Sequence, residues 1–412
     1  LLKLMILGGG SCQVNAINKA KEFGHEVIVA DYLDNPPGRE IADTFVKAST
    51  FDYGRCLEEA KKFNINGVMT LGTDQPVLTC AKVSEELGLP FCIDVETAVN
   101  VTNKSKMKQI FEKNNIPTAN FRFISKNFME EELSNLNPPY VIKPIDSQGQ
   151  RGVYKLNTIE EIKTDIDSVL TFSRANIALI EEYYESDEIT VSGWVYNKKL
   201  KILTITDRNT FSSGKHIGIC KSHVFPSKYY DKYYKEIHDI SERITTAFDI
   251  ENGPIYYQLL IGNRGIIVNE IAARIGGAYE DIFIPIITGV DFLDFLIKSS
   301  LGEKIDISKI ENYDIDKNKE FLKVIMLFAK PGLINKMTDI NEIVSMNGVL
   351  AAGYNYKAGN ILGDIQDARL RVGYVVIKGD NKANLDENID RVFSKLKIYN
   401  EHNENILLDL EN

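Results

Sequence analysis

The segment IIVNEIAARIGG, from Ile266 to Gly277, carries the most information about the fold of this chain. It has the pattern of a β-strand that stays apolar until it reaches Glu270, with Arg274 four residues later. A carboxylate at a strand end can bind a hard cation, which prefers oxygen ligands, and a guanidinium can bind a transferring phosphoryl group. The segment therefore indicates phosphate chemistry, although an edge strand that ends in a surface ion pair has the same pattern.

A second strand precedes this segment and predicts a β-hairpin. The run GPIYYQLLI, from Gly253 to Ile261, is followed by the turn Gly262-Asn263-Arg264-Gly265 and then by the strand that carries Glu270. Two apolar runs separated by a short turn that contains glycine pair as a hairpin. The pairing is expected to bring Gln258 beside Glu270.

Composition and charge exclude several classes of protein. The length of 412 residues suggests two or three domains, and 44% hydrophobic with 26% charged residues is enough for a large core. The net charge is -10 and the basic residues are scattered, so no nucleic-acid surface is expected. The apolar runs, including Leu1 to Leu7, are too short for a membrane span. Five widely spaced cysteines without a CxxC pair favour a reduced, cytoplasmic setting without a zinc knuckle.

Residues 1–103 alternate short apolar runs with amphipathic stretches. This alternation predicts βαβ units and a parallel sheet that binds its ligand at the carboxyl ends of the strands. Gly8, Gly9 and Gly10 follow the first strand, and Asp31 follows the second. A glycine-rich turn with an acid about 20 residues later is typical of dinucleotide sites. The spacing is not GxGxxG, so a substrate-binding loop is favoured over a NAD site.

The rest of the chain predicts an α+β unit over residues 104–314 and a β-rich unit over residues 315–412. Asn103 is a suitable N-cap for a helix over Lys104 to Asn114, which Ile116-Pro117 ends. The other expected elements are strands at Tyr140 to Pro144 and Ile177 to Tyr183, helices at Glu160 to Leu170 and Tyr233 to Phe248, a strand pair within Glu188 to Thr206 that turns at Asn197-Lys198, and a last helix at Leu385 to Leu396.

The strand YVIKP places Lys143 among apolar residues, and a polar loop with Gly149 and Gly152 follows it. A lysine in such a strand loses hydration unless an anion meets it. A flexible loop beside the lysine favours phosphate binding, and a hairpin turn with a lysine that reaches solvent is the alternative. Further along, the run EEYY from Glu181 to Tyr184, followed by Glu188, forms an acidic hinge.

The order of these features resembles the ATP-grasp superfamily. Lys104, Lys143 with its loop, the EEYY hinge, Gln258 and the strand with Glu270 and Arg274 follow one another at similar spacings. Within the superfamily the chain looks closest to the biotin carboxylase and carbamoyl-phosphate synthetase branch. The resemblance implies an ATP-grasp fold in three parts: an α/β domain over residues 1–103, a split ATP-binding domain over 104–314 with a lid at about 118–184, and a β-rich domain over 315–412.

The resemblance also implies a nucleotide site. The lysines that reach the α- and β-phosphates of ATP correspond to Lys104 and Lys143. The residues that would close over the phosphates, meet adenine or bind ribose are Ser147, Gly149 and Gly152 in the loop, then Glu181 with the backbone of Glu182, Tyr183 and Tyr184, and finally Glu188.

The catalytic and metal positions follow from the same resemblance. Gln258 and Glu270 correspond to the pair that binds Mg²⁺ or Mn²⁺, and Arg274 to the arginine that stabilises the transferred phosphoryl group. His216, in the run from Ser212 to Pro226, resembles a residue that binds the γ-phosphate or the intermediate. A solvated loop histidine is the alternative for His216.

One position departs from the superfamily's pattern. The usual Glu-x-Asn-x-Arg stands here as Glu270-Ile271-Ala272-Ala273-Arg274, so Ala272 replaces an asparagine that helps to hold the second metal. Asn269 is one residue too early, and neighbouring residues of a strand point to opposite faces. We therefore expect Asn269 to point away from the site, and whether one or two metals bind stays open at this point.

The resemblance implies an ATP- and Mg²⁺-dependent ligase that activates a carboxylate as an acylphosphate for attack by an amine. Its partners would be small carboxylates and amines, without nucleic acid or membrane, and this branch often forms homodimers.

Several rival functions remain open. A dipeptide-forming amino-acid ligase fits the RIGG ending and the trailing domain, where Arg371-Val372-Gly373 would contribute to the acceptor side. A phosphoribosylglycinamide synthetase of purine biosynthesis lacks its Gly-Asp-Pro-Glu segment here, and a biotin carboxylase lacks its His-Gln-Lys triplet. A carbamoyl-phosphate-synthetase-like enzyme is a further ligase alternative. A weakened ATP-binding regulator, suggested by Ala272, and a NAD-dependent enzyme are the rivals from other classes.

Overall fold

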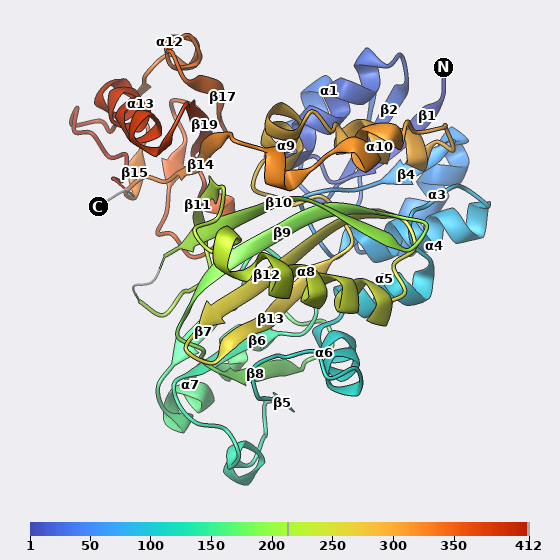
Figure 1. Ribbon diagram of the computed structural model, residues 1–412, viewed down its shortest axis with the longest axis vertical. Helices are drawn as coiled ribbons and strands as arrows, with labels where there is room; N and C mark the ends of the chain where they lie inside the picture. Colours follow the sequence, from blue (N-terminus) through green and yellow to red (C-terminus); the bar gives the residue numbers. More distant parts are fainter. Residues whose placement is uncertain (212–213, 410–412) are drawn as a thin grey trace.

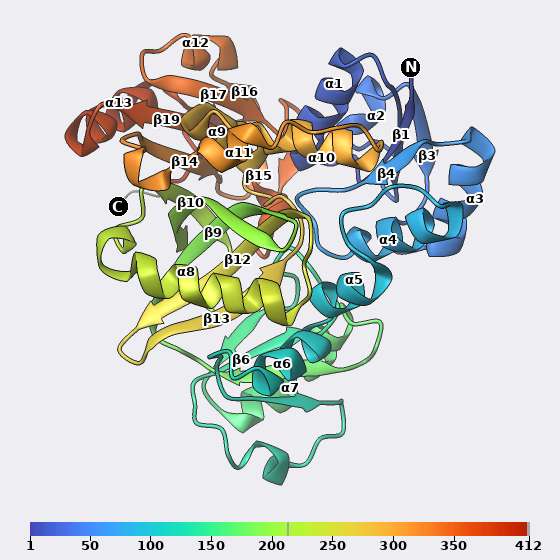
Figure 2. The ribbon, with the colours of Figure 1, turned by 45° about the vertical axis from the view of Figure 1, so that its right-hand side comes forward.

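The computed structural model describes residues 1–211 and 214–409 (Figure 1). A large central sheet lies between three smaller bodies: the N-terminal body, a lid that protrudes from the opposite end, and the C-terminal body (Figures 1 and 2). The expected mixture of a parallel N-terminal sheet, antiparallel sheets and a β-rich C-terminal region is confirmed.

The N-terminal sheet is parallel, with strand order β3-β2-β1-β4. Its apolar strands are buried because helices cover both faces, as in other doubly wound sheets. The strands are β1 (Lys3–Leu7), β2 (Glu26–Asp31), β3 (Thr44–Lys47) and β4 (Gly67–Met69), and the helices are α1 (Val14–Glu22), α2 (Gly38–Ile41), α3 (Tyr53–Phe63), α4 (Pro76–Leu87) and α5 (Val95–Thr102).

Two helices from much later in the chain pack against this N-terminal body: α9 (Glu280–Thr288) and α10 (Phe292–Ser300). Leu4 of β1 and Phe292 of α10 belong to one buried hydrophobic cluster. The contact is close, because a Cβ added at Gly67 would lie 2.1 Å from the carbonyl oxygen of Ser300. The N-terminal body is therefore packed directly onto the segment that follows Arg274.

The lid is an antiparallel sheet with strand order β5-β8-β6-β7, and a helix packs on it. It corresponds to the lid expected at about residues 118–184. Its elements are β5 (Phe121–Ile124), β6 (Tyr140–Pro144), β7 (Tyr154–Leu156), α7 (Ile159–Leu170) and β8 (Ala178–Glu182), and α6 (Lys104–Lys113) precedes it. Asn103 caps α6 as predicted, with its Oδ1 accepting from the N–H groups of Ser105 and Lys106.

The central sheet has eight strands in the order β13-β12-β9-β10-β11-β14-β19-β17. Its first five strands precede residue 315, and β14, β17 and β19 follow it, so the C-terminal region is hydrogen-bonded into the same sheet. The boundary expected at residue 314 stays a prediction. The strands are β9 (Ser186–Tyr196), β10 (Lys199–Thr210), β11 (Cys220–Phe225), β12 (Gly253–Gly262), β13 (Gly265–Ala272), β14 (Phe321–Leu327), β17 (Val349–Tyr354) and β19 (Gly373–Gly379).

Helices and short strands complete the structure. Helix α8 (Tyr230–Ala247) packs on the central sheet, and α13 (Lys382–Lys395) packs on β19. The short elements are α11 (Ser308–Asn312), α12 (Ile340–Val344), the pair β15 (Gly332–Leu333) with β18 (Ile361–Leu362), and the pair β16 (Lys336–Met337) with β20 (Ile398–Tyr399). Across the described residues, no helix has the length and apolar character that a membrane crossing requires.

The predicted hairpin is present and contains an irregularity at its functional end. Gln258 of β12 pairs with Glu270 of β13 as expected, but the next pair along is Leu259 with Val268, so Asn269 has no partner in the register. Such a β-bulge turns two consecutive side chains toward the same side of the sheet. Asn269 and Glu270 are both partly exposed, whereas Val268 and Ile271 are buried. The expectation that Asn269 points away from Glu270 is therefore wrong, because the strand does not alternate through the bulge.

Candidate active site

A cavity of about 1310 Å³ lies where the bodies meet. The loops after β1, β2 and β4 line one side of it, and the lid loop after β6 lines another. The edge strand that carries Glu270, the strands next to it in the central sheet and residues within 363–371 of the C-terminal region complete the lining. The cavity therefore collects polar residues from all the bodies, as a ligand site between domains does.

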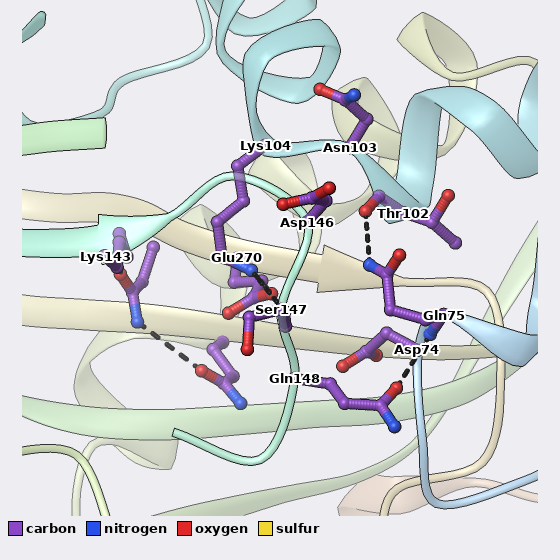
Figure 3. A network of polar contacts seen from close by, with 12 residues as sticks. Asp74, Gln75, Thr102, Asn103, Lys104, Lys143, Asp146, Ser147, Gln148 and Glu270 are labelled. Atoms are coloured by element: carbon purple, nitrogen blue, oxygen red, sulfur yellow. Dashed lines mark hydrogen bonds and ion pairs between the residues drawn. The ribbon is translucent and has the colours of Figure 1, made fainter. Parts of the chain in front are cut away.

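The predicted lysines lie in this cavity and are paired with carboxylates. Lys104 Nζ lies 2.9 Å from Glu270 and donates to the carbonyl oxygen of Ser147 at 3.2 Å (Figure 3). Lys143 Nζ lies 2.5 Å from Glu181 and donates to Asn269 Oδ1 at 3.3 Å. Both lysines are buried. Buried ammonium groups at strand and helix ends next to a loop are suited to binding phosphate, which would replace their carboxylate partners.

A third buried lysine, Lys108, was missed by the sequence analysis. It lies one helical turn after Lys104 in α6 and pairs with the same Glu181 as Lys143 does. Burial lowers the pKa of Lys108, and the Glu181 carboxylate opposes that shift. Its sequence signal was its spacing, because Lys104, Lys108 and the buried Phe111 recur every three or four residues on one face of α6.

Glu270, Gln258 and Asn269 supply oxygen atoms to one side of the cavity. Burial opposes ionisation of Glu270, but the ammonium groups of Lys104 and Lys143 hold its pKa below the ordinary value, so it is a carboxylate at neutral pH. Gln258 Oε1 accepts from Asn269 Nδ2 at 3.4 Å. One carboxylate with two amide oxygens is a donor set that suits Mg²⁺ or Mn²⁺. The described residues contain no cluster of three or more His, Cys, Asp or Glu side chains that suits a metal.

Arg274 is held by a residue of the N-terminal body. Its Nε and Nη2 lie 2.8 Å and 2.6 Å from Asp74 Oδ1, and its Nη1 donates to the carbonyl oxygen of Ile275 at 3.1 Å. Asp74 follows β4 and was not identified from the sequence. The glycines of the RIGG ending permit this approach, because a Cβ at Gly277 would lie 2.4 Å from the carbonyl oxygen of Gly72.

The loop after β6 reaches the N-terminal body and the C-terminal region. Gln148 Oε1 accepts from the N–H of Gln75 at 2.9 Å (Figure 3), and the carbonyl oxygen of Gly149 accepts from Ala368 N–H at 3.4 Å. Ser147 and Gly149 line the cavity as expected. Gly152 does not line it and faces the lid instead, where a Cβ would lie 2.9 Å from Phe172. Its φ of +72° explains the need for glycine there.

The EEYY hinge lines the cavity, but much of its hydrogen-bonding capacity is used within the protein. The N–H of Glu182 donates to Asn120, and the N–H of Tyr183 donates to Pro139. The Glu182 carboxylate accepts from Asn120 Nδ2 at 2.9 Å and from the N–H of Asn137. The carbonyl oxygen of Tyr184 also accepts from Ser186 Oγ at 3.0 Å, so the adenine role of the hinge backbone stays a prediction. Glu181, the first residue of this run, forms ion pairs with Lys108 and Lys143.

Glu188, the predicted ribose ligand, lines the cavity and is paired with Arg208 at 2.9 Å. Its Oε1 is buried without a hydrogen-bond partner. Burial raises the pKa of Glu188, and Arg208 opposes that shift. A buried oxygen without a hydrogen-bond partner is costly, and a ligand hydroxyl could satisfy it. The role of Glu188 in binding ribose stays a prediction.

His216, the second predicted catalytic residue, does not line the cavity. It forms a β-bridge with Tyr154 of the lid, and the ring centroids lie 5.1 Å apart. Burial and the Lys215 ammonium lower the pKa of His216, which favours a neutral ring. Its role in binding the γ-phosphate stays a prediction. Ser212 and Ser213, in the same predicted loop, lie outside the described residues.

A buried histidine nearby, His223, was not identified from the sequence. It lies in β11, its Nδ1 contacts Thr206 Oγ1 at 2.9 Å, and its Nε2 lies 3.6 Å from Glu280 Oε1. Both atoms of this last pair lack hydrogen-bond partners. Burial lowers the pKa of His223 and raises that of Glu280.

Gly8 and Gly10 of the N-terminal glycine run line the same cavity. The N–H of Gly9 donates to Asp31 Oδ2 at 2.8 Å, and Leu33 N–H donates to Asp31 Oδ1. Both oxygens of the acid that would bind a dinucleotide ribose are used to hold the loop. This arrangement agrees with the substrate-binding loop that the spacing favoured over a NAD site.

Comparison with known proteins identifies the family. The model of the ATP-grasp domain matches residues 136–281. This chain contains an ATP-grasp domain. The model of the L-amino acid ligase C-terminal domain 2 matches residues 325–401. The predicted resemblance to ATP-grasp ligases is therefore confirmed, and it extends into the C-terminal region.

Individual relatives agree with this assignment. The phosphoribosylamine–glycine ligase of Pyrococcus furiosus is 24% identical over 67% of this chain and 67% of its own length. The L-arginine-specific L-amino acid ligase of Bacillus subtilis is 23% identical over 70% of each chain. The crystal structure of the L-amino acid ligase from Bacillus licheniformis superposes with a TM-score of 0.81 at 18% identity, over 97% of this chain and 99% of that one. The expectation of an ATP-grasp ligase is confirmed at the level of the class.

Proposed function

We propose that this protein is an ATP- and Mg²⁺-dependent ligase that joins the carboxylate of one amino acid to an amine, with a second amino acid as the favoured acceptor. The observation that carries the proposal is the placement of Lys104, Lys143, Glu270 and Arg274 around one cavity whose far wall comes from a region similar to the C-terminal domain of L-amino acid ligases.

The phosphate end of the cavity has the groups that phosphoryl transfer needs. Lys104 and Lys143 would bind the phosphates of ATP, and the loop with Ser147 and Gly149 would exclude water over them. Gln258 and Glu270 would hold Mg²⁺, which when bound supplies charge neutralisation for the phosphoryl group. Arg274 would stabilise the charge that develops during transfer, because Asp74 fixes the direction of its guanidinium.

Two displacement steps complete the proposed reaction. An oxygen of the substrate carboxylate attacks the γ-phosphorus of ATP, the bond to the β-phosphate oxygen breaks, and ADP leaves. The amine nitrogen then attacks the acyl carbon, the bond to the phosphate oxygen breaks, inorganic phosphate leaves with the electron pair, and the nitrogen loses a proton. Exclusion of water protects the acylphosphate between the steps.

A second part of the cavity wall, around Arg371 and here called the acceptor end, suits a carboxylate-bearing acceptor. Arg371, in the segment before β19, donates from Nη1 to the carbonyl oxygen of Gly277 at 2.8 Å, and its buried Nε has no hydrogen-bond partner. Within the described parts of the chain, Arg371 forms no ion pair. A guanidinium with unsatisfied donors favours a ligand carboxylate, so Arg371 is proposed to bind the acceptor.

The test is ATP-dependent phosphate release with a panel of amino acids, other amines and bicarbonate. The expected result is stimulation by pairs of amino acids and a dipeptide product detected by mass spectrometry. Hydroxylamine added with the active carboxylate should trap a hydroxamate only when ATP is present. A panel in which no carboxylate stimulates phosphate release or yields a hydroxamate would contradict the ligase function and favour a weakened ATP-binding regulator.

A second candidate is the phosphoribosylglycinamide synthetase reaction. The sequence similarity to the Pyrococcus furiosus enzyme favours it. The same panel tests it when glycine is supplied with freshly generated phosphoribosylamine. Stimulation by that pair, and by no amino-acid pair, would support it over the amino-acid ligase.

Oligomeric state and location form a separate part of the proposal. We infer a homodimer from the ATP-grasp branch that the sequence resembles, and light scattering of the purified protein tests it. A cytoplasmic location is supported by five cysteines that form no disulfide, and cell fractionation tests it.

A further inference from the structure

The β-bulge at Asn269 places a polar side chain where regular strand geometry would not. Gln258 pairs with Glu270, and Leu259 pairs with Val268, so Asn269 is the inserted residue. Bulges next to active sites commonly redirect a side chain, and the cavity lining here includes both Asn269 and Glu270. The bulge therefore adds one amide to the metal side of the cavity without adding a charge.

The contacts of Asn269 define which way its amide faces. Its Oδ1 accepts from Lys143 Nζ at 3.3 Å, and its Nδ2 donates to Gln258 Oε1 at 3.4 Å. Lys143 is a donor only, which fixes the oxygen of Asn269 on that side. An amide oxygen has two lone pairs, so Oδ1 can keep Lys143 and still bind a cation.

The position that usually carries this amide lacks an oxygen. Ala272 lies on the cavity side of β13, opposite Tyr256 in β12, and its methyl group cannot bind a cation. The Arg274 guanidinium stacks over the Tyr256 ring at 4.7 Å, so that part of the wall is already filled. Without Asn269, the protein side of the proposed site has only Gln258 and Glu270.

We propose that Asn269 Oδ1 is a third oxygen ligand for the divalent cation, in place of the asparagine that Ala272 has replaced. The inference rests on the proposed function only in requiring a cation–nucleotide complex in this cavity. It accounts for the bulge and the alanine together, and it requires Oδ1, which now accepts from Lys143, to share its second lone pair with the cation. The apparent weakening of the metal site would then be a relocation of one ligand by three residues.

Binding of Mn²⁺ to the protein with bound ADP tests this inference directly. Electron paramagnetic resonance measures the Mn²⁺ affinity without any requirement for turnover. Asn269→Ala should weaken that affinity by roughly tenfold or more, as the loss of a group around a metal typically does. The double variant N269A/A272N should recover most of it, because it returns an amide oxygen to the same side of β13. Asn263→Ala, in the exposed turn of the same hairpin, is the matched control and should bind Mn²⁺ as the parent does.

A second variant keeps the test decisive if Asn269→Ala is poorly folded. Asn269→Asp preserves shape and oxygen, so it should bind Mn²⁺ at least as tightly as the parent, and circular dichroism checks the fold of each variant. Equal Mn²⁺ affinity in Asn269→Ala and the parent would overturn the inference. The inference would also be overturned if Asn269→Ala kept the parental Mn²⁺ affinity but bound metal-free ADP more weakly. Asn269 would then serve only to hold Lys143.

The outcome is separable from the proposed reaction. A parent protein that binds Mn²⁺ with ADP through Asn269 and ligates no amino acid would contradict the proposed function and support this inference. If the parent protein ligates amino acids and Asn269→Ala keeps the parental Mn²⁺ affinity, the proposed function would be supported and this inference contradicted. A parent protein that binds no Mn²⁺ would overturn the inference.

Discussion

The two ends of the cavity differ in how their charges are satisfied. At the phosphate end, Lys104, Lys108 and Lys143 are each paired with Glu181 or Glu270. At the proposed acceptor end, Arg371 lines the cavity and its buried Nε has no hydrogen-bond partner. Paired ammonium groups are stable before ligand arrives, whereas unsatisfied polar atoms gain most from a ligand. We therefore propose that the phosphate end is assembled before ligand binds and that the substrate completes the acceptor end.

The largest effect should come from removing the charge on Glu270. Glu270→Gln keeps the size of the side chain but removes the partner of Lys104 and the proposed carboxylate ligand of the cation. We expect Mg²⁺-dependent ATP turnover to fall by roughly 1000-fold or more. Ala272→Asn should keep turnover or increase it, because it adds an oxygen near the cation. A Glu270→Gln enzyme with the parental rate would contradict the proposed role of Glu270 as a ligand of the cation.

Arg274→Lys should have the next largest effect. The substitution keeps a positive charge but loses the fork that Asp74 holds. We expect kcat to fall by roughly 100-fold or more while ATP affinity changes little, because the arginine acts mainly in the transition state. Steady-state kinetics with a separate ATP-binding measurement checks this. A loss of ATP affinity without a loss of kcat would place Arg274 in ground-state binding instead.

Lys143→Met separates binding from folding at the phosphate end. It removes the charge and keeps most of the apolar stem, so nucleotide affinity should fall by roughly tenfold, with the fold retained. Lys104→Met should behave similarly. Calorimetric titration with ATP measures the effect, and parental affinity in both variants would contradict the proposed phosphate contacts.

Arg371→Met tests the acceptor end and should leave the phosphate end intact. We expect KM for the acceptor to rise by roughly tenfold, since a charged hydrogen bond is lost, with ATP affinity unchanged. An acceptor that lacks a carboxylate should be much less affected. The proposal fails if both kinds of acceptor respond equally.

The last prediction concerns stability at acid pH rather than activity. Burial opposes ionisation of Glu181, but Lys108 and Lys143 lower its pKa from 4.5 to about 2. A lowered folded-state pKa gives stability that is present above the unfolded pKa and lost as pH falls through the folded one. We expect urea titrations to show a loss on the order of 2 kcal/mol from Glu181 between pH 4.5 and 2. Lys108→Met should reduce this pH dependence, because one of the two ammonium groups is gone.

The sequence predicted the elements that depend on local pattern. The hairpin with Gln258 opposite Glu270, the cap at Asn103 and the strand around Lys143 are all present. Each follows from periodicity, a turn or a capping residue, which act over a few residues. The prediction for Asn269 failed for the same reason, because strict alternation cannot reveal a bulge.

The pairings between distant segments could not be read from the pattern. Lys108 and Asp74 looked like ordinary charged residues until the fold placed them against Glu181 and Arg274. His216 matched a loop pattern, but its bridge to Tyr154 holds it away from the cavity lining.

By itself, the sequence determined the ATP-grasp resemblance and the parallel N-terminal sheet. It also identified charged residues that line the cavity, including Lys104, Lys143 and Glu270. Tertiary structure alone decided which carboxylate neutralises which lysine, that Asn269 joins Gln258 and Glu270, and that Arg371 lies beside Gly277. The physical reason is the separation along the chain of the residues that interact. Strand period and helix caps are encoded by neighbours, whereas an ion pair between residues 200 positions apart, such as Arg274 with Asp74, exists only after the sheets have packed.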